Sequence, residues 1–319
     1  MTRRAALGAA AAALCLAAPS AAAAQTPQGS LSVGLRGAIE EGEQHLVLRG
    51  RSVVVTGTVA PFVAGDSVVV RFKRGAKTVK ALRAPLAATG DGSKGYFSAR
   101  YKPSRTGHVS VRVTHYAIPQ VGVLRRRLGV EVVGTSLAGG SRGPLVRALQ
   151  RGLDRMGYAV PRTGAYDAGT ARAVLAYRKV NGMARLLTAS RSIVTRVLAR
   201  RGAFKARDRG KGRHAEVDIS RQILALVENG RPAGVYAVST GKPSTPTVQG
   251  RFRVYRKQPG SNEKAMFYSS YFIRGYAVHG YPSVPVNAAA SHGCVRVPMA
   301  DAISIYGWLS PGVGVYVYV

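Results

Sequence analysis

The sequence has few cysteines and few acidic residues. Only two cysteines, Cys15 and Cys294, occur in 319 residues, so a scaffold built on several disulfides is excluded. Asp and Glu number 14 against 47 Lys and Arg, which gives a formal net charge of +33 and predicts anionic surroundings. The basic residues are scattered among Gly, Ala and Val instead of being interleaved with aromatics. This pattern disfavours nucleic acid as a partner and favours a polyanionic matrix.

The N-terminus lacks an apolar run long enough for a membrane-spanning anchor. Two arginines precede a run from Ala5 to Ala18, which Pro19 ends before the roughly 20 residues that a span needs. Small residues at 22–24 then offer a cleavage site. We therefore expect residues 1–24 to be a secretory signal peptide that meets the membrane only transiently, with an uncleaved anchor as the alternative. The arginine pair leaves both the general and the twin-arginine export routes open.

Removal of this signal would also remove Cys15. Cys294 would then be the one thiol of an exported protein, which excludes an internal disulfide. An unpaired cysteine outside the cell is either bonded to another molecule or kept as a reactive thiol.

The length predicts more than one domain. We expect residues 25–135 to form an immunoglobulin-like antiparallel β-sandwich, because short β-branched runs alternate with Gly, Pro and Asp turns. The alternation of Val109, Val111 and Val113 with polar residues is the clearest strand signal. A Gly/Ser-rich linker at 134–143 follows.

Helical spacing replaces the strand pattern after this linker. Pro144 begins a stripe of Leu145, Leu149, Leu153 and Met156, which predicts a first helix. Asp167 opens a second helix, and a third is expected near 192–198. We assign residues 141–200 to a small three-helix domain.

A basic segment at 201–213 follows and is expected to be a solvated linker. Residues 214–319 return to strands and form a mostly β domain. Asn229 and Gly230 predict a tight hairpin turn, since both tolerate positive φ. The fold class is therefore multidomain and mainly β.

The stretch "SHGCVRV" holds the candidate chemistry. If it is extended, His292, Cys294 and Arg296 share one face while Val295 and Val297 point into the core. A histidine can take the proton of a thiol, and a guanidinium can lower the thiol pKa or hold a carboxylate. His279, at the end of the strand "YAVHG", is a second candidate base, and amides near Gly293 could stabilise an oxyanion.

Two other interpretations of Cys294 stay open on the residues alone. A single cysteine is often a small buried hydrophobe. His279, His292 and Cys294 are also acceptable zinc ligands, although a structural site needs four ligands and the nearest carboxylates, Glu263 and Asp301, lack ligand-like spacing.

Several blocks of the C-terminal region carry a family resemblance. "VDISRQ", "VYAVSTGKPSTPTVQGRFRV", "YFIRGYAVHG" and "HGYPSVPVNAAASHGCVRV" occur in the order found in L,D-transpeptidase catalytic domains, the YkuD family. Residues 141–200, with "GPLVRALQRGLDRMGYAVPRTGAYDAGTARAVLAYRKVNGM", resemble the three-helix peptidoglycan-binding domain of cell-wall enzymes. The segment from His279 to Ser291 departs from many members by being short and carrying Val286-Asn287.

The resemblance implies a function and a set of site residues. It implies that Cys294 is the nucleophile, that His279 is the general base, and that substrate is bound by Ser291, His292, Gly293 and Arg296. It implies transfer of a peptidoglycan stem peptide to an amine without metal or organic cofactor, and acylation of the thiol by carbapenems. Partners would be stem peptides, glycan and anionic cell-wall polymers, and the protein would lie in the cell wall. A hydrolase of the same fold and a non-catalytic wall-binding protein are the alternatives.

Overall fold

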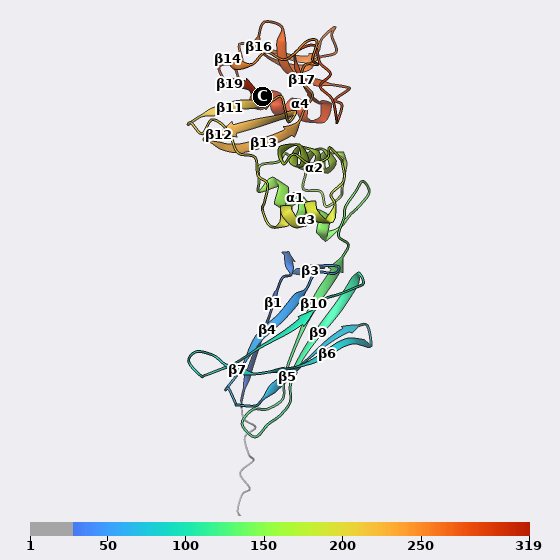
Figure 1. The fold of residues 1–319 in the computed structure, drawn as a ribbon, viewed down its shortest axis with the longest axis vertical. Helices are drawn as coiled ribbons and strands as arrows, with labels where there is room; N and C mark the ends of the chain where they lie inside the picture. The colour runs from blue at the N-terminus through green and yellow to red at the C-terminus, as the bar shows by residue number, and fades with distance from the viewer. Residues whose placement is uncertain (1–27) are drawn as a thin grey trace, which may run out of the picture.

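The computed structural model describes residues 28–319, which form three successive parts: a β-sandwich, a group of helices and a second β region (Figure 1). The expected signal peptide, with Cys15, lies outside the described residues. No helix within the described range is long and apolar enough to cross a membrane.

The first part consists of two sheets that enclose one core of Val, Leu and Phe side chains. One sheet has the order β1-β4-β8-β7 and the other the order β2-β3-β10-β9-β5-β6. The predicted antiparallel pattern is wrong at one place, because β3 and β10 pair in parallel. The strands are β1 (Ser30–Arg36), β2 (Ile39–Glu41), β3 (Gln44–Leu48), β4 (Val53–Ala60), β5 (Ser67–Arg74), β6 (Lys77–Pro85), β7 (Ala87–Ala88), β8 (Gly95–Tyr101), β9 (Gly107–His115) and β10 (Leu124–Val133).

Three helices follow, as the apolar spacing predicted: α1 (Pro144–Asp154), α2 (Ala168–Val180) and α3 (Arg191–Leu198). Pro144 occupies the first turn of α1. The Asp167 side chain caps α2 by accepting a hydrogen bond from the Thr170 amide. The segment expected to be a free linker at 134–143 is tied to this part, because Leu137 pairs with Ala189.

The C-terminal part is built on two sheets with one helix packed among their strands. The five-stranded sheet has the order β13-β12-β11-β19-β14, and the four-stranded sheet the order β15-β16-β17-β18. Asn229 and Gly230 have φ of 51° and 73°, as the predicted turn between β12 and β13 requires. The elements are β11 (Arg213–Asp218), β12 (Ile223–Glu228), β13 (Arg231–Ala237), β14 (Gly250–Arg253), β15 (Arg256–Ser261), β16 (Phe267–Ile273), β17 (Tyr276–Tyr281), β18 (Val295–Pro298), α4 (Met299–Trp308) and β19 (Gly314–Tyr318).

The helices and the five-stranded sheet share a hydrophobic core. On β12, Ile223, Ala225 and Val227 pack with the helical core, whereas Leu224 and Leu226 pack with the core of the C-terminal part. The continuous apolar run "ILALV" is thus explained, since both faces of this strand are covered. Figure 1 shows α2 lying against β12 and β13.

Polar contacts reinforce this junction. Arg172 on α2 forms a bidentate pair with Asp301 on α4, with N to O distances of 2.8 and 2.9 Å. Lys179 is buried, and its ammonium donates to the carbonyls of Gln222 and Val238 at 3.3 and 3.1 Å. Burial lowers the pKa of Lys179 to about 7, and the nearby charge of Arg185 adds to this effect. The helices are therefore a fixed part of the C-terminal architecture.

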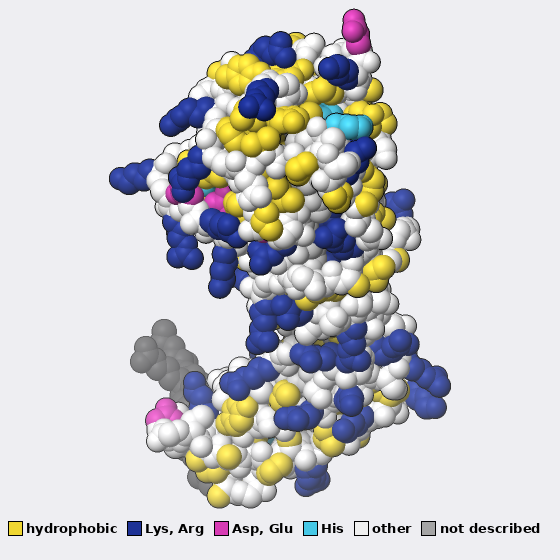
Figure 2. Space-filling model, turned by 45° about the horizontal axis from the view of Figure 1, so that its top comes forward, with side chains coloured by type: hydrophobic (Ala, Val, Ile, Leu, Met, Phe, Trp, Pro, Cys, Tyr) yellow, Lys and Arg dark blue, Asp and Glu magenta, His cyan; other side chains and the backbone are white. Residues whose placement is uncertain are grey.

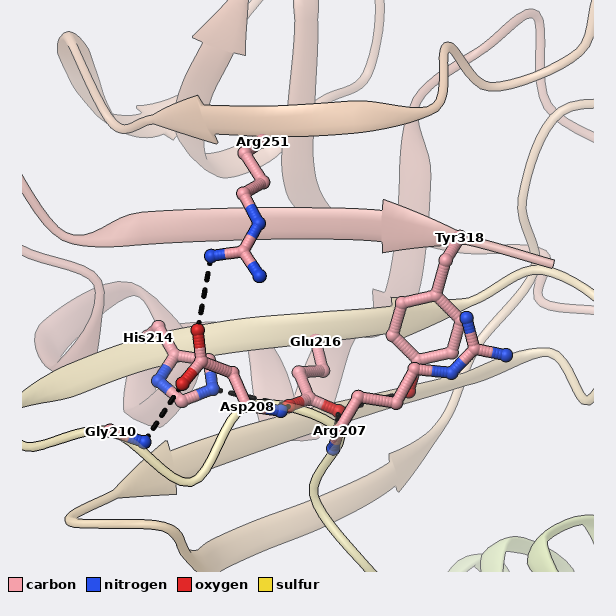
Figure 3. Close-up of polar contacts among 7 residues, drawn as sticks. All are labelled: Arg207, Asp208, Gly210, His214, Glu216, Arg251 and Tyr318. Carbon is pink, nitrogen blue, oxygen red and sulfur yellow. Dashed lines mark hydrogen bonds and ion pairs between the residues drawn. The ribbon is translucent and has the colours of Figure 1, made fainter.

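The basic segment 201–213 is anchored to the C-terminal sheet, which differs from the solvated linker expected. Glu216 on β11 is buried and accepts the amides of Arg207 and Asp208 at 3.0 and 2.9 Å, together with the Tyr318 hydroxyl at 2.9 Å (Figure 3). A buried carboxylate needs such donors, so it fixes the path of the segment. The composition of 201–213 could not predict this anchor, because the carboxylate that accepts its amides, Glu216, lies outside the segment.

Replacing Lys179 by Met tests the buried ammonium. Between pH 7 and 10 the unfolded chain keeps a proton on this lysine that the folded chain has lost, so wild-type stability rises across this window. From pH 7 to pH 10, we expect the free energy of unfolding of wild type to rise by on the order of 3 kcal/mol more than that of Lys179→Met. Thermal unfolding at both pH values measures this, with the exposed Lys205→Met as control. A difference in the free energy of unfolding between wild type and Lys179→Met that stays constant with pH would contradict the lowered pKa of Lys179.

Candidate active site

The Ser-His-Gly-Cys segment forms a tight bend immediately before β18. The Ser291 hydroxyl donates to the Cys294 carbonyl at 2.6 Å and accepts the Gly293 amide at 3.0 Å. Ser291 is buried, so these bonds are protected from competition by water. The serine therefore holds the backbone that carries the thiol.

The chain that follows β13 anchors this bend from outside. Ser239 and Arg296 exchange two backbone hydrogen bonds, of 3.0 and 2.9 Å. The Thr240 carbonyl accepts the Ser291 amide at 3.0 Å, and the Lys242 amide donates to the Ser291 carbonyl at 3.0 Å. Cys294 is thus positioned by both the preceding and the following residues.

Gly293 is required at its position by backbone conformation and by space. Its φ is +116°, a value that residues with a side chain rarely adopt. A Cβ atom there would lie 2.3 Å from the ring of Tyr276. The bend can therefore pack against Tyr276 only with glycine.

His279 lies on β17, which pairs in parallel with β18 so that His279 is in register with Arg296. Its Nδ1 is 2.9 Å from the Gly280 carbonyl, so Nδ1 carries the proton and Nε2 is free to accept one. Burial lowers the pKa of His279 to about 4, and the positive Arg296 adds to this against the hydrogen bond to Gly280. The imidazole is neutral at physiological pH.

Cys294 is half-buried and packs against Met266, Tyr271 and Ala277. Burial raises the pKa of its thiol, while an amide hydrogen bond from Ala277 and the charge of Arg296 act in the opposite direction. The Sγ atom lies 3.9 Å from the Gly275 carbonyl, to which the thiol donates weakly. The resting site thus combines a neutral thiol with a neutral imidazole.

A hollow of about 390 Å³ lies over these side chains. It is large enough for part of a peptide, and its charged lining residues, Lys264 and Arg296, are basic. Arg296 stacks on Tyr281, with its guanidinium carbon 3.9 Å from the ring centre, and forms no ion pair within residues 28–319. A substrate carboxylate that entered the hollow could form an ion pair with the Arg296 guanidinium. The lining consists of Lys264, Met266, Gly275, Tyr276, His279, Tyr281, Ser291, His292, Cys294 and Arg296.

The structure brings five of the six candidate residues to this hollow, and the sixth, Gly293, packs against Tyr276 of its lining. The expected alternation holds: Val295 and Val297 are buried, Cys294 and Arg296 are half-buried, and His292 is exposed. The backbone from 292 to 294 is bent, however, because Gly293 has positive φ.

Sequence reasoning missed the remaining lining residues. Tyr281 could have been found, since it lies two residues after His279 on a strand and shares its face. Lys264 and Met266 come from the connection between β15 and β16, where no sequence pattern predicted their approach.

The arrangement is suited to acyl transfer through sulfur. A neutral imidazole close to a thiol can accept its proton, and a guanidinium can hold an anionic substrate group. In the part of the chain that the structure describes, no cluster of three or more His, Cys, Asp or Glu could hold a metal ion.

Two family models match this chain. The L,D-transpeptidase catalytic domain (YkuD) matches residues 212–317, and a putative peptidoglycan binding domain matches residues 142–185. No curated protein matches the chain.

Solved structures also resemble the chain. A crystal structure of the L,D-transpeptidase (residues 123–326) from Xylanimonas cellulosilytica is 31% identical, covers 58% of this chain and 98% of its own, and has a TM-score of 0.53. The catalytic domain of the Enterococcus faecium L,D-transpeptidase is 24% identical, covers 35% and 100%, and has a TM-score of 0.31. An L,D-transpeptidase from Mycobacterium smegmatis is 12% identical, covers 91% and 100%, and has a TM-score of 0.31.

The protonation state of the site predicts how Cys294 reacts with alkylating agents. Because the thiol pKa is raised and His279 is neutral above about pH 4, the thiolate fraction should keep rising through pH 9. We expect the iodoacetamide rate to increase about tenfold per pH unit from pH 6 to 8.

The measurement uses Cys15→Ser, in which Cys294 is the remaining cysteine, with glutathione as the reference thiol. A rate that reaches its plateau below pH 7 would reveal a thiolate paired with imidazolium and would contradict this account.

Proposed function

This chain belongs to the L,D-transpeptidase family, and on that premise we propose that it is an exported cysteine acyltransferase that cross-links peptidoglycan stem peptides. The observation that carries the proposal is the single hollow in which Cys294, His279 and Arg296 meet. Peptidoglycan as substrate is supported by the catalytic and peptidoglycan-binding family models.

The first half-reaction forms a thioester. As a substrate carbonyl enters the hollow, His279 Nε2 takes the Cys294 proton, and the sulfur attacks the carbonyl of the L-centre that precedes the terminal D-residue of a stem peptide. The C–N bond to that D-residue breaks, and its nitrogen receives the proton from His279. The shortened stem peptide then remains bound to sulfur.

The second half-reaction transfers the acyl group to an amine. The side-chain amine of a neighbouring stem attacks the thioester, His279 accepts a proton from it, and the sulfur leaves as the thiol. The neutral histidine suits this exchange, because it can be protonated and deprotonated once in each half-reaction. Water in place of the amine would give hydrolysis.

The lining suggests how substrate is held. Arg296 and Lys264 provide positive charge for a stem-peptide carboxylate, and Tyr281 keeps the Arg296 guanidinium in place by stacking. The exposed His292 lies at the edge of the hollow, where it can contact substrate. Ser291 and Gly293 act by shaping the bend.

Location and partners are part of the same proposal. The signal-like N-terminus supports export to the cell wall. The net charge of +33 supports retention among anionic wall polymers, where the substrate lies.

Replacing Cys294 by Ala tests the nucleophile. Incubation of the purified protein with a disaccharide-tetrapeptide, read by mass spectrometry, should give a cross-linked dimer with wild type. Cys294→Ala should lower its formation to background, at least a thousandfold, because no acyl-enzyme can form. Cys15→Ala is the matched control and should retain full activity.

The products distinguish the candidate functions. A shortened stem without dimer would mean that water resolves the thioester and that the protein is a hydrolase. An unchanged substrate with wild type would favour a non-catalytic binding role. Dimer formation by Cys294→Ala above background would overturn the assignment of the nucleophile.

A further inference from the structure

Positive charge is concentrated on one sheet of the N-terminal β-sandwich. Strands β5, β6 and β10 carry three Lys or Arg residues each and β9 carries one, and the acids of this sheet are Glu131 on β10 and Glu40 and Glu41 on the far edge strand β2. The opposite sheet, β1-β4-β8-β7, carries Arg36 and Arg100. Lys and Arg side chains are spread over the visible face of the molecule and far outnumber Asp and Glu there (Figure 2), but this difference between two sheets of one sandwich is local.

Three arginines lie directly opposite one another across this sheet. Arg71 on β5 is in register with Arg112 on β9, which is in register with Arg127 on β10. Val70, Phe72, Val111 and Val113 beside them are buried, so the arginines point to the outer face. Like charges in such positions destabilise a sheet. A bound anion would therefore reduce the repulsion among these three arginines.

Carboxylates of the described chain do not neutralise this row. None of Arg71, Arg112 and Arg127 takes part in an ion pair within residues 28–319. Arg71 donates to the Tyr116 hydroxyl at 3.0 Å, and Arg127 donates to the Ser110 hydroxyl at 3.1 Å. These neutral acceptors orient two of the three guanidinium groups without cancelling their charge.

The row lies in a hollow of about 430 Å³ on the outer face. Besides the three arginines, three further cations line it on neighbouring positions of β5 and β10, namely Lys73, Arg125 and Arg126. Successive outward positions on a strand are about 7 Å apart and neighbouring strands about 5 Å apart, so the charges extend in two directions. Such a spread fits a chain of anionic groups better than one small anion.

We propose that this face, which we call the arginine face and define by Arg71, Lys73, Arg112, Arg125, Arg126 and Arg127, binds a linear wall polymer with repeated phosphodiester groups. Guanidinium forks match the paired oxygens of such groups, and five of the six cations are arginines. The choice of a wall polymer rests on the proposed function, whereas anion binding rests on the geometry alone.

The surroundings of the face favour this ligand over other polyanions. Tyr116 is the one aromatic residue in the lining, so the series of stacking platforms typical of single-stranded nucleic acid binding is missing. Val113 is the one aliphatic residue in the lining and is buried, so the exposed ring of Tyr116 is the one apolar group that the lining could insert into a lipid surface.

The test compares two triple variants of equal charge. Arg71→Gln, Arg112→Gln and Arg127→Gln together remove the row. Arg36→Gln, Arg51→Gln and Arg100→Gln together remove three exposed arginines elsewhere in the sandwich. Binding of the full chain to purified poly(glycerol phosphate) is measured by calorimetry at several salt concentrations.

We expect the row variant to bind poly(glycerol phosphate) at least tenfold more weakly than wild type. The slope of log K against log salt should fall by about 2, since each phosphate contact contributes roughly 0.7 in a flexible polyanion. The control variant should stay within threefold of wild type. Equal losses in both variants would mean that net charge alone binds the polymer, and they would overturn the proposal.

Further probes separate the ligand classes. Poly-glutamate bound as tightly as poly(glycerol phosphate) would overturn the choice of phosphodiester. Tighter binding of single-stranded DNA or of phosphatidylglycerol vesicles, lost in the row variant, would assign the face to those ligands and overturn the wall-polymer proposal.

A stability readout accompanies the binding experiment. Poly(glycerol phosphate) should raise the unfolding temperature of wild type and of the control variant but leave that of the row variant nearly unchanged. Cross-linking of a soluble disaccharide-tetrapeptide should be the same in all three proteins. A failure of the proposed function would remove this activity from wild type without altering polymer binding, so the two failures are distinguishable.

Discussion

The hydrogen bonds that hold the bend at 291–294 are the constraint on which the site depends. The Ser291 hydroxyl bonds to the Gly293 amide and to the Cys294 carbonyl, and the chain at 239–242 bonds to Ser291 at the start of the bend and to Arg296 just after it. Neither set would suffice alone, because a bend with Gly293 at positive φ has no regular ladder to maintain it. The thiol therefore owes its position to backbone groups far away in sequence.

This constraint extends to the helical part. The Gln222 side chain bonds to the Thr240 amide and hydroxyl, and the Gln222 carbonyl accepts from the buried Lys179 of α2. Thr240 in turn holds Ser291. A continuous series of contacts thus joins α2 to the bend that carries the nucleophile. The helices contribute to the support of the site, whatever they bind.

The sequence predicted the parts of the site that local patterns encode. Cys294 and Arg296 could be placed on one side because alternation with the buried Val295 and Val297 is a short-range property. His292 reaches the same hollow across the bend at Gly293, and the expectation that His279 ends its strand is wrong, because β17 continues to Tyr281. The hairpin at Asn229 and the capped start of α2 at Asp167 were predictable for the same reason. The immunoglobulin-like assignment of residues 25–135 and the substrate-binding roles of the site residues stay predictions.

Features that depend on distant partners could not be predicted. The anchoring of 201–213 depends on Glu216, the parallel pair of β3 and β10 on the fold of the whole sandwich, and the approach of Lys264 on a turn between strands. Helix α4 was missed because it begins directly after a strand, and its residues show no strong polar face.

The central claim is that Cys294 and His279 act as nucleophile and base from neutral resting states. Carbapenem acylation followed by intact-mass spectrometry and peptide mapping tests it most directly, because it isolates formation of the acyl-enzyme. The account predicts one adduct, located on Cys294, that forms at least a hundredfold more slowly in His279→Gln. An adduct on another residue, or an unchanged rate in His279→Gln, would contradict it.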